Sequence, residues 1–258
     1  MLKIEQLTKI YGEKKAVDDL SLHIRPGEIY GFIGHNGAGK TTTIKACCGI
    51  LNFEEGNIQI DGISVKENPL ECKKKLAYIP DNPDLYDFMT GIRYLNFIAD
   101  IFGVNANDRQ ERIHKYADMF ELTQDLAQPI SAYSHGMKQK LAIISALIHE
   151  PKLIIMDEPT VAVDPQSRNK ILEGIQKLNE QGSTIIYTSH YMEEVEQICT
   201  RIAIMDHGHV ITSGTKEELK KMIKTGETIT IEAVPLSPEN LADIRTLPHV
   251  FDLHYEEQ

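Results

Sequence analysis

The stretch that decides the fold is Gly34-His35-Asn36-Gly37-Ala38-Gly39-Lys40-Thr41-Thr42. An apolar run at residues 29–33 precedes it, and residues 42–49 have the composition of a helix. The pattern G-x-x-x-x-G-K-[ST] indicates a phosphate-binding loop when a strand precedes it and a helix follows it. The sequence therefore predicts a nucleoside triphosphate site here, and we call residues 34–42 the phosphate loop.

Each residue type in the phosphate loop has a chemical reason. Glycine reaches backbone torsions that are closed to other residues, so successive amides can turn inward around an anion. The helix that begins near Gly39 adds free N–H groups and the positive end of its dipole. Lys40 can reach the β- and γ-phosphates, and the Thr41 hydroxyl can ligate Mg²⁺. The predicted nucleotide ligands of this loop are Gly34, Asn36, Gly37, Ala38, Gly39, Lys40, Thr41 and Thr42.

Length and charge predict a domain boundary near residue 225. The 258 residues suffice for one large α/β domain with an appendage, and a net charge of −11 argues against a nucleic-acid partner. Residues 226–258 contain seven carboxylates and one basic residue, Arg245. We therefore predict a main domain at residues 1–225 and a small accessory segment at residues 226–258, in which the alternation at residues 228–233 suggests a strand.

The sequence also predicts the cellular compartment. No apolar run approaches the roughly 20 residues that span a bilayer, and the N-terminus lacks the apolar core of a signal peptide. We expect a cytosolic protein, which can still dock on a membrane protein. The cysteines have no metal-ligand spacing and are expected to be reduced, packed thiols. They are Cys47, Cys48, Cys72 and Cys199.

Hydrophobic periodicity predicts strands and helices in alternation. Alternating apolar residues or apolar runs indicate strands at residues 2–7, 20–24, 57–60, 76–79, 153–156 and 184–188. Residues 90–128 are expected to be wholly helical and to belong to a helical subdomain at about residues 82–150. Further helices are expected to begin near Ser134 and at Pro165. The turn at residues 206–208 should join two strands, 202–205 and 209–211.

Two acidic residues follow the apolar run 153–156. Asp157 ends a predicted core strand at the edge where ligands of parallel sheets bind, and it can position Mg²⁺ at the phosphates. Glu158 follows directly, and the turning chain at a strand end can aim both carboxylates at one site. Glu158 is therefore the candidate base that orients and deprotonates an attacking water.

Several segments, in this order along the chain, resemble motifs of the ATP-binding cassette (ABC) ATPases. The phosphate loop resembles their Walker A motif, and Tyr11 the aromatic residue that stacks on adenine. Ser-Ala-Tyr-Ser-His-Gly-Met-Lys-Gln-Lys-Leu at residues 131–141 resembles the signature motif, and Leu-Ile-Ile-Met-Asp-Glu-Pro-Thr at residues 153–160 resembles Walker B. Residues 163–164 resemble the D-loop, and residues 188–190 the segment with the switch histidine.

The resemblance covers about residues 2–223 and implies an α/β fold. This would be the P-loop NTPase fold of ABC ATPases, with an antiparallel β subdomain and an α-helical insertion. Ser134 and Gly136 would bind the γ-phosphate of ATP in trans, in a head-to-tail dimer that holds two ATP molecules between its cassettes. His190 would hydrogen-bond the γ-phosphate and hold the attacking water. Asp164 could bridge the cassettes or cap the helix at Pro165, and the sequence leaves both open. The predicted catalytic residues are Lys40, Glu158 and His190.

The chain departs from the family pattern at a few positions. Asp81 stands where the family has a glutamine that touches Mg²⁺. A carboxylate also suits this hard cation, but it adds negative charge beside the triphosphate. His135 and Met137 replace a glycine and a glutamine of the signature, and Val161 replaces a serine. The predicted Mg²⁺ ligands are Thr41, Asp81 and Asp157.

The motifs together imply an ATP-hydrolysing subunit of an ABC transporter. Its implied partners are integral membrane permease subunits and a second copy of itself or a paralogous cassette, at the inner face of the cell membrane. The signature segment and the short chain resemble bacterial exporter cassettes of the antibiotic-resistance and Ecs-like kind, which favours export. The expected docking surface is around residues 81–93, where Tyr86, Phe88 and Met89 could contact the permease or pack internally.

Two alternative functions stay open at the level of sequence. One is a soluble ABC-type ATPase that remodels DNA or ribosomes, although the 94 positions from Lys40 to Ser134 are too few for the coiled coil of DNA-repair members. The other is an ATP-gated interaction module with slow hydrolysis, which only Asp81 and Val161 favour. A P-loop kinase or GTPase is disfavoured because no guanine motif is present.

Overall fold

The structure is a computed structural model that describes residues 1–223 of the chain. Residues Met1–Lys221 form one compact unit. The predicted accessory segment 226–258, with its strand at residues 228–233, lies outside the described residues.

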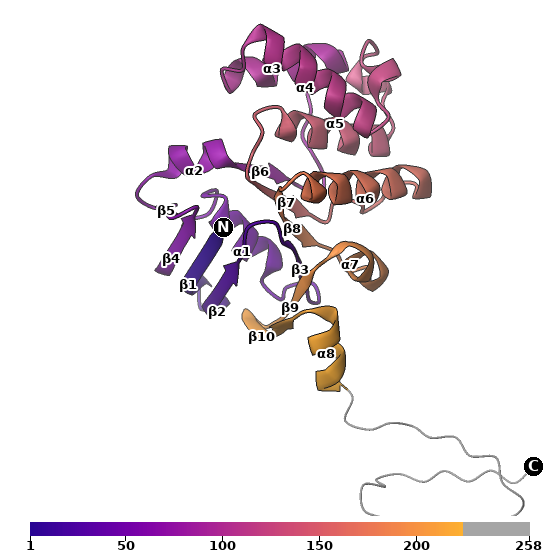
Figure 1. Ribbon diagram of the computed structural model, residues 1–258. Coiled ribbons are helices and arrows are strands. Elements are labelled where there is room, and N and C mark those ends of the chain that lie inside the picture. The colour runs from indigo at the N-terminus through magenta and orange to yellow at the C-terminus, as the bar shows by residue number, and fades with distance from the viewer. Residues whose placement is uncertain (224–258) are drawn as a thin grey trace, which may run out of the picture. The chain divides into compact units, whose positions relative to one another are not determined.

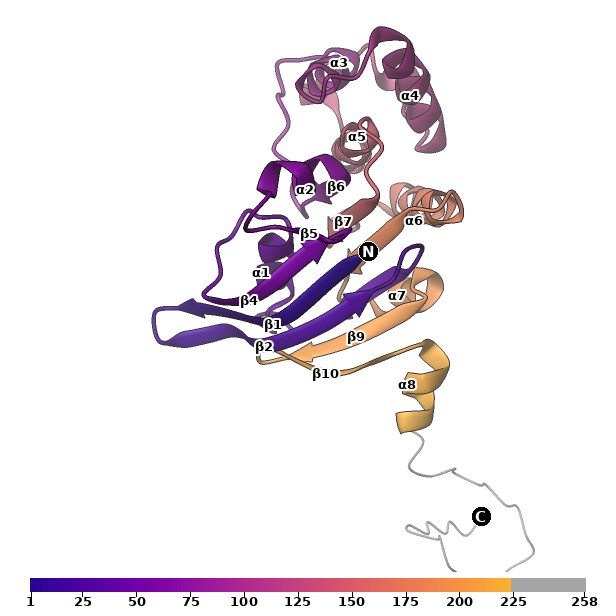
Figure 2. The same ribbon diagram turned by 60° about the vertical axis from the view of Figure 1, so that its left-hand side comes forward.

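Two sheets form the framework of this unit (Figures 1 and 2). The antiparallel sheet has the strand order β2-β1-β4-β5 and consists of β1 (Leu2–Tyr11), β2 (Lys14–Ile24), β4 (Glu55–Ile60) and β5 (Ile63–Ser64). The second sheet has the order β10-β9-β3-β8-β7-β6 and is parallel except for its edge strand β10. Its strands are β3 (Ile29–Ile33), β6 (Leu76–Ile79), β7 (Leu153–Asp157), β8 (Thr184–Thr188), β9 (Arg201–Asp206) and β10 (His209–Gly214). This is the predicted α/β architecture with an antiparallel β subdomain.

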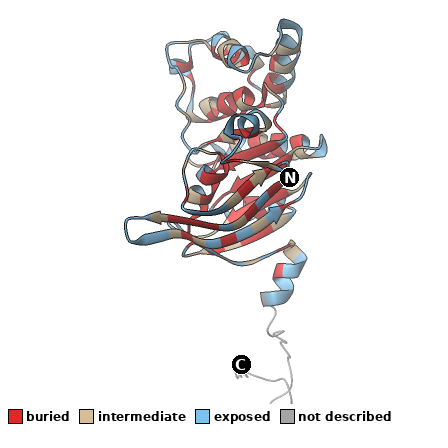
Figure 3. Cartoon of the chain, turned by 90° about the vertical axis from the view of Figure 1, so that its left-hand side faces the viewer, coloured by how far each residue is buried: buried red, intermediate tan, exposed pale blue. Residues whose placement is uncertain are grey.

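The parallel sheet is covered on both faces because successive strand residues point in opposite directions. Ile155 and Ile186 pack with Ile44 of helix α1 (Lys40–Cys47) and with the antiparallel sheet. Ile154 and Ile185, their neighbours along β7 and β8, pack with the helices of the other face. All residues of β7 and β8 are buried, as continuous apolar runs predict (Figure 3).

Helices α3 (Gly91–Ile101), α4 (Ala106–Met119) and α5 (His135–Leu147) lie together at one end, with α5 nearest the parallel sheet (Figures 1 and 2). The prediction that residues 90–128 are wholly helical is wrong. The chain turns away after α3 at Gly103, which has a φ of +66°. The Asn105 side chain then caps α4 by accepting a hydrogen bond from the Asp108 amide at 3.0 Å. A second break separates α4 from the 3-10 turn Thr123–Asp125.

The remaining helices are α2 (Pro69–Lys75), the 3-10 turn Ile130–Ala132, α6 (Pro165–Glu180), α7 (Met192–Ile198) and α8 (Lys216–Ile223). The predicted helix starts near Ser134 and at Pro165 are confirmed, because Ser134 and Asp164 are the N-caps of α5 and α6. The four cysteines are free and buried, as predicted. Burial raises the pKa of the Cys47 thiol to about 12, so this thiol is neutral and unreactive at pH 7.

Candidate functional site

The phosphate loop is held in a narrow space at the carboxyl end of β3. Gly37 and Gly39 have φ angles of +88° and +102°, the left-handed region that favours glycine. A side chain on Gly39 would also meet the Ala16 carbonyl oxygen at 2.6 Å, and one on Gly34 would meet the Met205 carbonyl oxygen at 2.4 Å. The loop thus needs glycine both for its torsions and for its contacts with β2 and β9.

Lys40, the first residue of α1, folds back over the loop. Its ammonium donates to the carbonyl oxygens of Gly34 at 2.6 Å and His35 at 3.2 Å, and the side chain is 6% exposed. These carbonyl oxygens hold the Lys40 ammonium near the loop amides. The oxygens of a bound triphosphate could replace the two carbonyls as acceptors for the ammonium. The loop therefore fits a phosphate group in backbone geometry and in charge.

Three oxygen-bearing side chains meet where β7 and β8 end. The Thr41 hydroxyl lies 3.3 Å from Asp157 Oδ1, and the Thr188 hydroxyl donates to the same oxygen at 2.7 Å. Asp157 is buried. Burial of the neighbouring Tyr78 hydroxyl, and next the negative charge of Asp157, raise the pKa of Tyr78, so that this hydroxyl stays neutral. Hydroxyl and carboxylate oxygens are the ligands that Mg²⁺ prefers, so this donor set fits that ion.

Glu158 and His190 form a pair beside this cluster. Glu158 leaves β7 with a φ of +49°, a conformation that non-glycine residues rarely adopt, and its amide donates to the Thr188 hydroxyl at 2.8 Å. This turn brings Glu158 Oε2 to 3.2 Å from Nδ1 of His190, which follows β8. The two adjacent carboxylates therefore serve different partners: Asp157 faces Thr41, and Glu158 faces His190.

Sequence reasoning did not single out Thr188 and Glu194. Thr188 joins Asp157 to the Glu158 backbone, yet in the sequence it is an ordinary β-branched strand residue. Glu194 lies in α7 and is almost completely buried, where it accepts hydrogen bonds from Thr160 at 2.8 Å, Tyr187 at 2.6 Å and Ser189 at 2.9 Å. It thereby ties the end of Walker B to the residue before His190. Nothing in the sequence distinguishes Glu194 from a solvated helix glutamate.

The signature residues contact the D-loop region. The Ser134 hydroxyl accepts from the Met137 amide at 3.2 Å. A side chain on Gly136 would lie 2.7 Å from Ser167 Oγ and 2.8 Å from Asp164 Oδ2, so α5 and α6 approach closely there. Among residues 1–223, no hydrogen bond or ion pair joins Ser134 or Gly136 to the phosphate loop of the same chain.

The structure puts the other predicted site residues in less constrained places. Tyr11, at the end of β1, is half exposed, with the Lys9 ammonium 5.2 Å from its ring centroid. Asp81 is exposed just after β6, and in the described part of the chain it has no hydrogen bond or ion pair. Asp164 caps α6 by accepting from the Ser167 amide at 2.9 Å, and this bond lowers the pKa of its carboxyl group.

Comparison with known proteins agrees with this fold. The family model described as ABC transporter matches residues 17–161 of the chain. The chain therefore belongs to the ABC transporter family, as an ATP-binding subunit with the ATPase activity of that family. Within residues 1–223, no helix has the length and apolar character needed to cross a membrane.

Three relatives illustrate the assignment. The linearmycin resistance ATP-binding protein LnrL of Bacillus subtilis (strain 168) is 39% identical over 257 residues, which are 100% of this chain and 83% of LnrL. A solved ATP-binding subunit of an ABC transporter is 30% identical with a TM-score of 0.80, over 86% of this chain and 93% of that one. A dimeric post-hydrolysis cassette bound to ADP and Pi is 26% identical with a TM-score of 0.75, over 83% and 98% of the two chains.

Proposed function

We propose that this chain drives export by hydrolysing ATP as one half of a dimer bound to integral membrane permease subunits. The observation that carries the proposal is a chain of contacts at the carboxyl edge of the parallel sheet. The Thr188 hydroxyl links Asp157 to the Glu158 backbone, Asp157 meets Thr41, and Glu158 meets His190. That edge is where ligands of α/β proteins bind, and the phosphate loop ends there too.

The residues divide the chemistry among them. The amides of residues 34–42 and Lys40 bind the β- and γ-phosphates, and Tyr11 stacks on adenine. Thr41 and Asp157 would hold Mg²⁺, with Asp81 as a further oxygen donor, and the bound ion would supply positive charge to the phosphates. Glu158 takes a proton from the attacking water, and His190 Nδ1 fixes that carboxylate through their 3.2 Å contact. His190 Nε2 is left for the γ-phosphate or the water.

The second half of the site comes from a second cassette. Ser134 and Gly136 lie at the N-terminus of α5, and a helix N-terminus can bind an anion. Within residues 1–223, neither residue has a hydrogen bond or ion pair to its own phosphate loop. The dimeric relative with ADP and Pi supports an arrangement in which they face the γ-phosphate of the partner cassette. Hydrolysis would then open the dimer and move the permease.

The permease surface we propose lies around residues 81–93. Tyr86 and Phe88 are 46% and 80% exposed, and their rings stack with centroids 5.8 Å apart. Met89, in contrast, packs against the core. An exposed aromatic pair in the helical subdomain suits an apolar segment of a membrane subunit. The cassette would therefore sit at the cytoplasmic, inner face of the membrane.

We also propose the domain division: an ABC ATPase domain at residues 1–225, with the helical subdomain at about 82–150, and an accessory segment at 226–258. The compactness of residues Met1–Lys221 and the clustering of α3, α4 and α5 support it. Export is supported by the relative LnrL, whose name describes it as a resistance protein.

The test is a comparison of the wild type with Glu158→Gln. At saturating Mg-ATP, light scattering should find the variant as a dimer, because it binds ATP but lacks the general base for hydrolysis, the step that opens the dimer. Without nucleotide the variant should be monomeric. The ATP turnover of the wild type should exceed that of the variant. Glu111→Gln is the matched control, since Glu111 is an exposed residue of α4 far in sequence from the site motifs. A monomeric Glu158→Gln protein under Mg-ATP would refute the dimeric site.

A further inference from the structure

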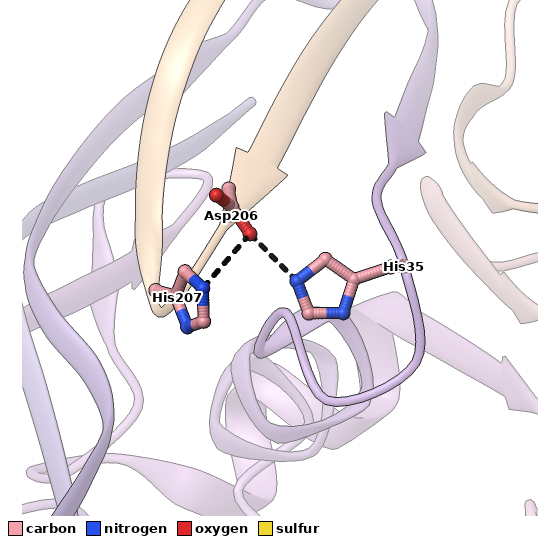
Figure 4. Close-up of side chains that lie close together, drawn as sticks. All are labelled: His35, Asp206 and His207. Carbon is pink, nitrogen blue, oxygen red and sulfur yellow. Dashed lines mark hydrogen bonds and ion pairs between the residues drawn. The ribbon is translucent and has the colours of Figure 1, made fainter.

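Three potential metal ligands lie together, apart from the oxygen cluster at Thr41 and Asp157 (Figure 4). Asp206 ends β9 and His207 follows it in the β9–β10 turn, while His35 belongs to the phosphate loop. Asp206 Oδ1 is 2.6 Å from His35 Nε2 and 3.7 Å from His207 Nε2. In the described part of the chain, this is the one group of three or more such side chains whose ligand atoms all lie within 4.8 Å of one another.

We propose that His35, Asp206 and His207 bind a divalent transition metal ion of the Zn²⁺ class. Two imidazole nitrogens and one carboxylate oxygen suit Zn²⁺, Ni²⁺ or Cu²⁺ better than Mg²⁺ or Ca²⁺, which prefer oxygen ligands only. Three protein ligands leave the fourth position of a tetrahedral ion to water. The site is thus chemically distinct from the oxygen cluster at Thr41 and Asp157.

The observed distances are close to those of an occupied site. With Zn–N and Zn–O bonds of about 2.0–2.2 Å, adjacent ligand atoms of a tetrahedral ion are roughly 3.4 Å apart. The 3.7 Å between Asp206 and His207 already agrees with this spacing. The 2.6 Å contact between Asp206 and His35 is a hydrogen bond that must open by about 0.8 Å. The side chains are 54%, 44% and 81% exposed in the order His35, Asp206, His207, so small rotations suffice.

The backbone beneath these side chains is fixed. The Gly208 amide donates to the Ala38 carbonyl at 3.0 Å, and the Gly208 carbonyl accepts from the Asp18 amide at 3.1 Å. Gly34 meanwhile packs directly on the Met205 carbonyl. The β9–β10 turn is therefore bound to the phosphate loop before any ion arrives. This reduces the conformational entropy that is lost when an ion binds.

A bound ion would join segments that are far apart in the sequence. His35 and Asp206 are separated by 171 positions, so an ion that binds both only in the folded chain stabilises the fold. It would also hold the phosphate loop on the β9–β10 turn. We therefore expect Zn²⁺ to raise the melting temperature of the nucleotide-free protein.

The experiment uses the full, untagged chain, freed of metal by a chelator and without nucleotide. Calorimetric titration with Zn²⁺ should reveal a site with a stoichiometry of one, and Co²⁺ should give the visible absorption of a four-coordinate ion. His35→Ala and His207→Ala should each weaken Zn²⁺ binding at least about tenfold and abolish the Zn²⁺-dependent rise in melting temperature. His114→Ala is the matched control, because His114 is an exposed histidine 3.1 Å from one carboxylate, Asp118, and belongs to no such group among the described residues.

His207 is the most exposed of the three ligands, so His207→Ala should leave the metal-free melting temperature unchanged. Asp206→Asn keeps the shape of the side chain and removes its charge, and it should weaken binding in the same way. Zn²⁺ binding that is equally tight in the wild type and in all three variants would locate the ion elsewhere and overturn the proposal. The proposal would also be overturned if the wild type did not bind Zn²⁺ at about 0.1 mM free ion. A dissociation constant of about 0.1 mM corresponds to a binding free energy of about −5.5 kcal/mol.

Discussion

Replacing Thr188 by valine should impair hydrolysis more than it impairs folding. Thr188 is fully buried, and its hydroxyl both donates to Asp157 Oδ1 at 2.7 Å and accepts from the Glu158 amide at 2.8 Å. Valine has nearly the same shape, so the change removes these two bonds without a cavity. Asp157 keeps the longer contact with Thr41, and the Glu158 amide keeps the Thr188 carbonyl at 3.2 Å.

The expected magnitude follows from the hydrogen bond to the buried carboxylate. Such a bond contributes about 1.5–3 kcal/mol, so the free energy of unfolding should fall by about that amount. This corresponds to a decrease in melting temperature of roughly 3–12 °C for a domain of this size. If the same free energy orients Asp157 and Glu158 in the transition state, kcat should fall between about ten- and a hundredfold.

Thr184→Val is the matched control. Thr184 lies at the other end of β8, is equally buried and accepts one hydrogen bond, from the Gly27 amide at 3.0 Å. Loss of this hydrogen bond should lower the free energy of unfolding by about 1 kcal/mol, with little change in kcat. Urea unfolding and steady-state ATPase assays on both variants separate the two effects. A Thr188→Val protein whose kcat stays within about twofold of the wild type, despite a loss of stability, would refute this role of the hydroxyl.

Two further predictions concern packing and pH. Gly136→Ala should lower the free energy of unfolding by about 1–3 kcal/mol, because its new methyl group would meet Ser167 and Asp164 within 2.8 Å; an unchanged urea midpoint would contradict this. Burial lowers the pKa of His149, whose Nε2 donates to the Leu76 carbonyl at 3.1 Å and whose buried Nδ1 has no partner. The unfolded chain takes up a proton near its ordinary pKa of about 6.5 and the folded chain does not, so stability falls as the pH drops below that value. His149→Gln should flatten this slope between about pH 7 and 5, measured by urea unfolding at several pH values.

Apolar runs were the most informative feature of the sequence. The strands predicted at residues 76–79 and 184–188 coincide with β6 and β8, and that at residues 153–156 is one residue shorter than β7. These strands are buried in the parallel sheet, where nearly every residue must be apolar, so their limits are visible in the sequence. Helices α2 and α7 were not predicted. Each has only seven residues, too few for a helical period to stand out from its polar surroundings.

The candidate site follows the same division. Glycine, lysine and acidic residues at fixed spacings predicted the phosphate loop, Asp157 and Glu158, and the resemblance to the family predicted His190. Glu194 acts through tertiary contacts with Thr160, Tyr187 and Ser189. A residue whose role depends on what folds against it leaves no local pattern, so only the structure could identify it.

For Ser134, the sequence predicts the local structure but not the partner. A serine followed by a helix predicts an N-cap, and the Ser134 hydroxyl does accept from the Met137 amide. The same pattern predicts free amides that can bind a phosphate, but not which chain carries that phosphate. Because a side chain on Gly136 would meet Ser167 and Asp164 within 2.8 Å, the start of α5 packs closely against the start of α6. A partner cassette that binds ATP through Ser134 would therefore also press on Asp164, which lies five residues from the Pro159 turn after Glu158. On the proposed dimer, the contact with the partner's ATP would therefore lie close in sequence to the residues proposed for hydrolysis.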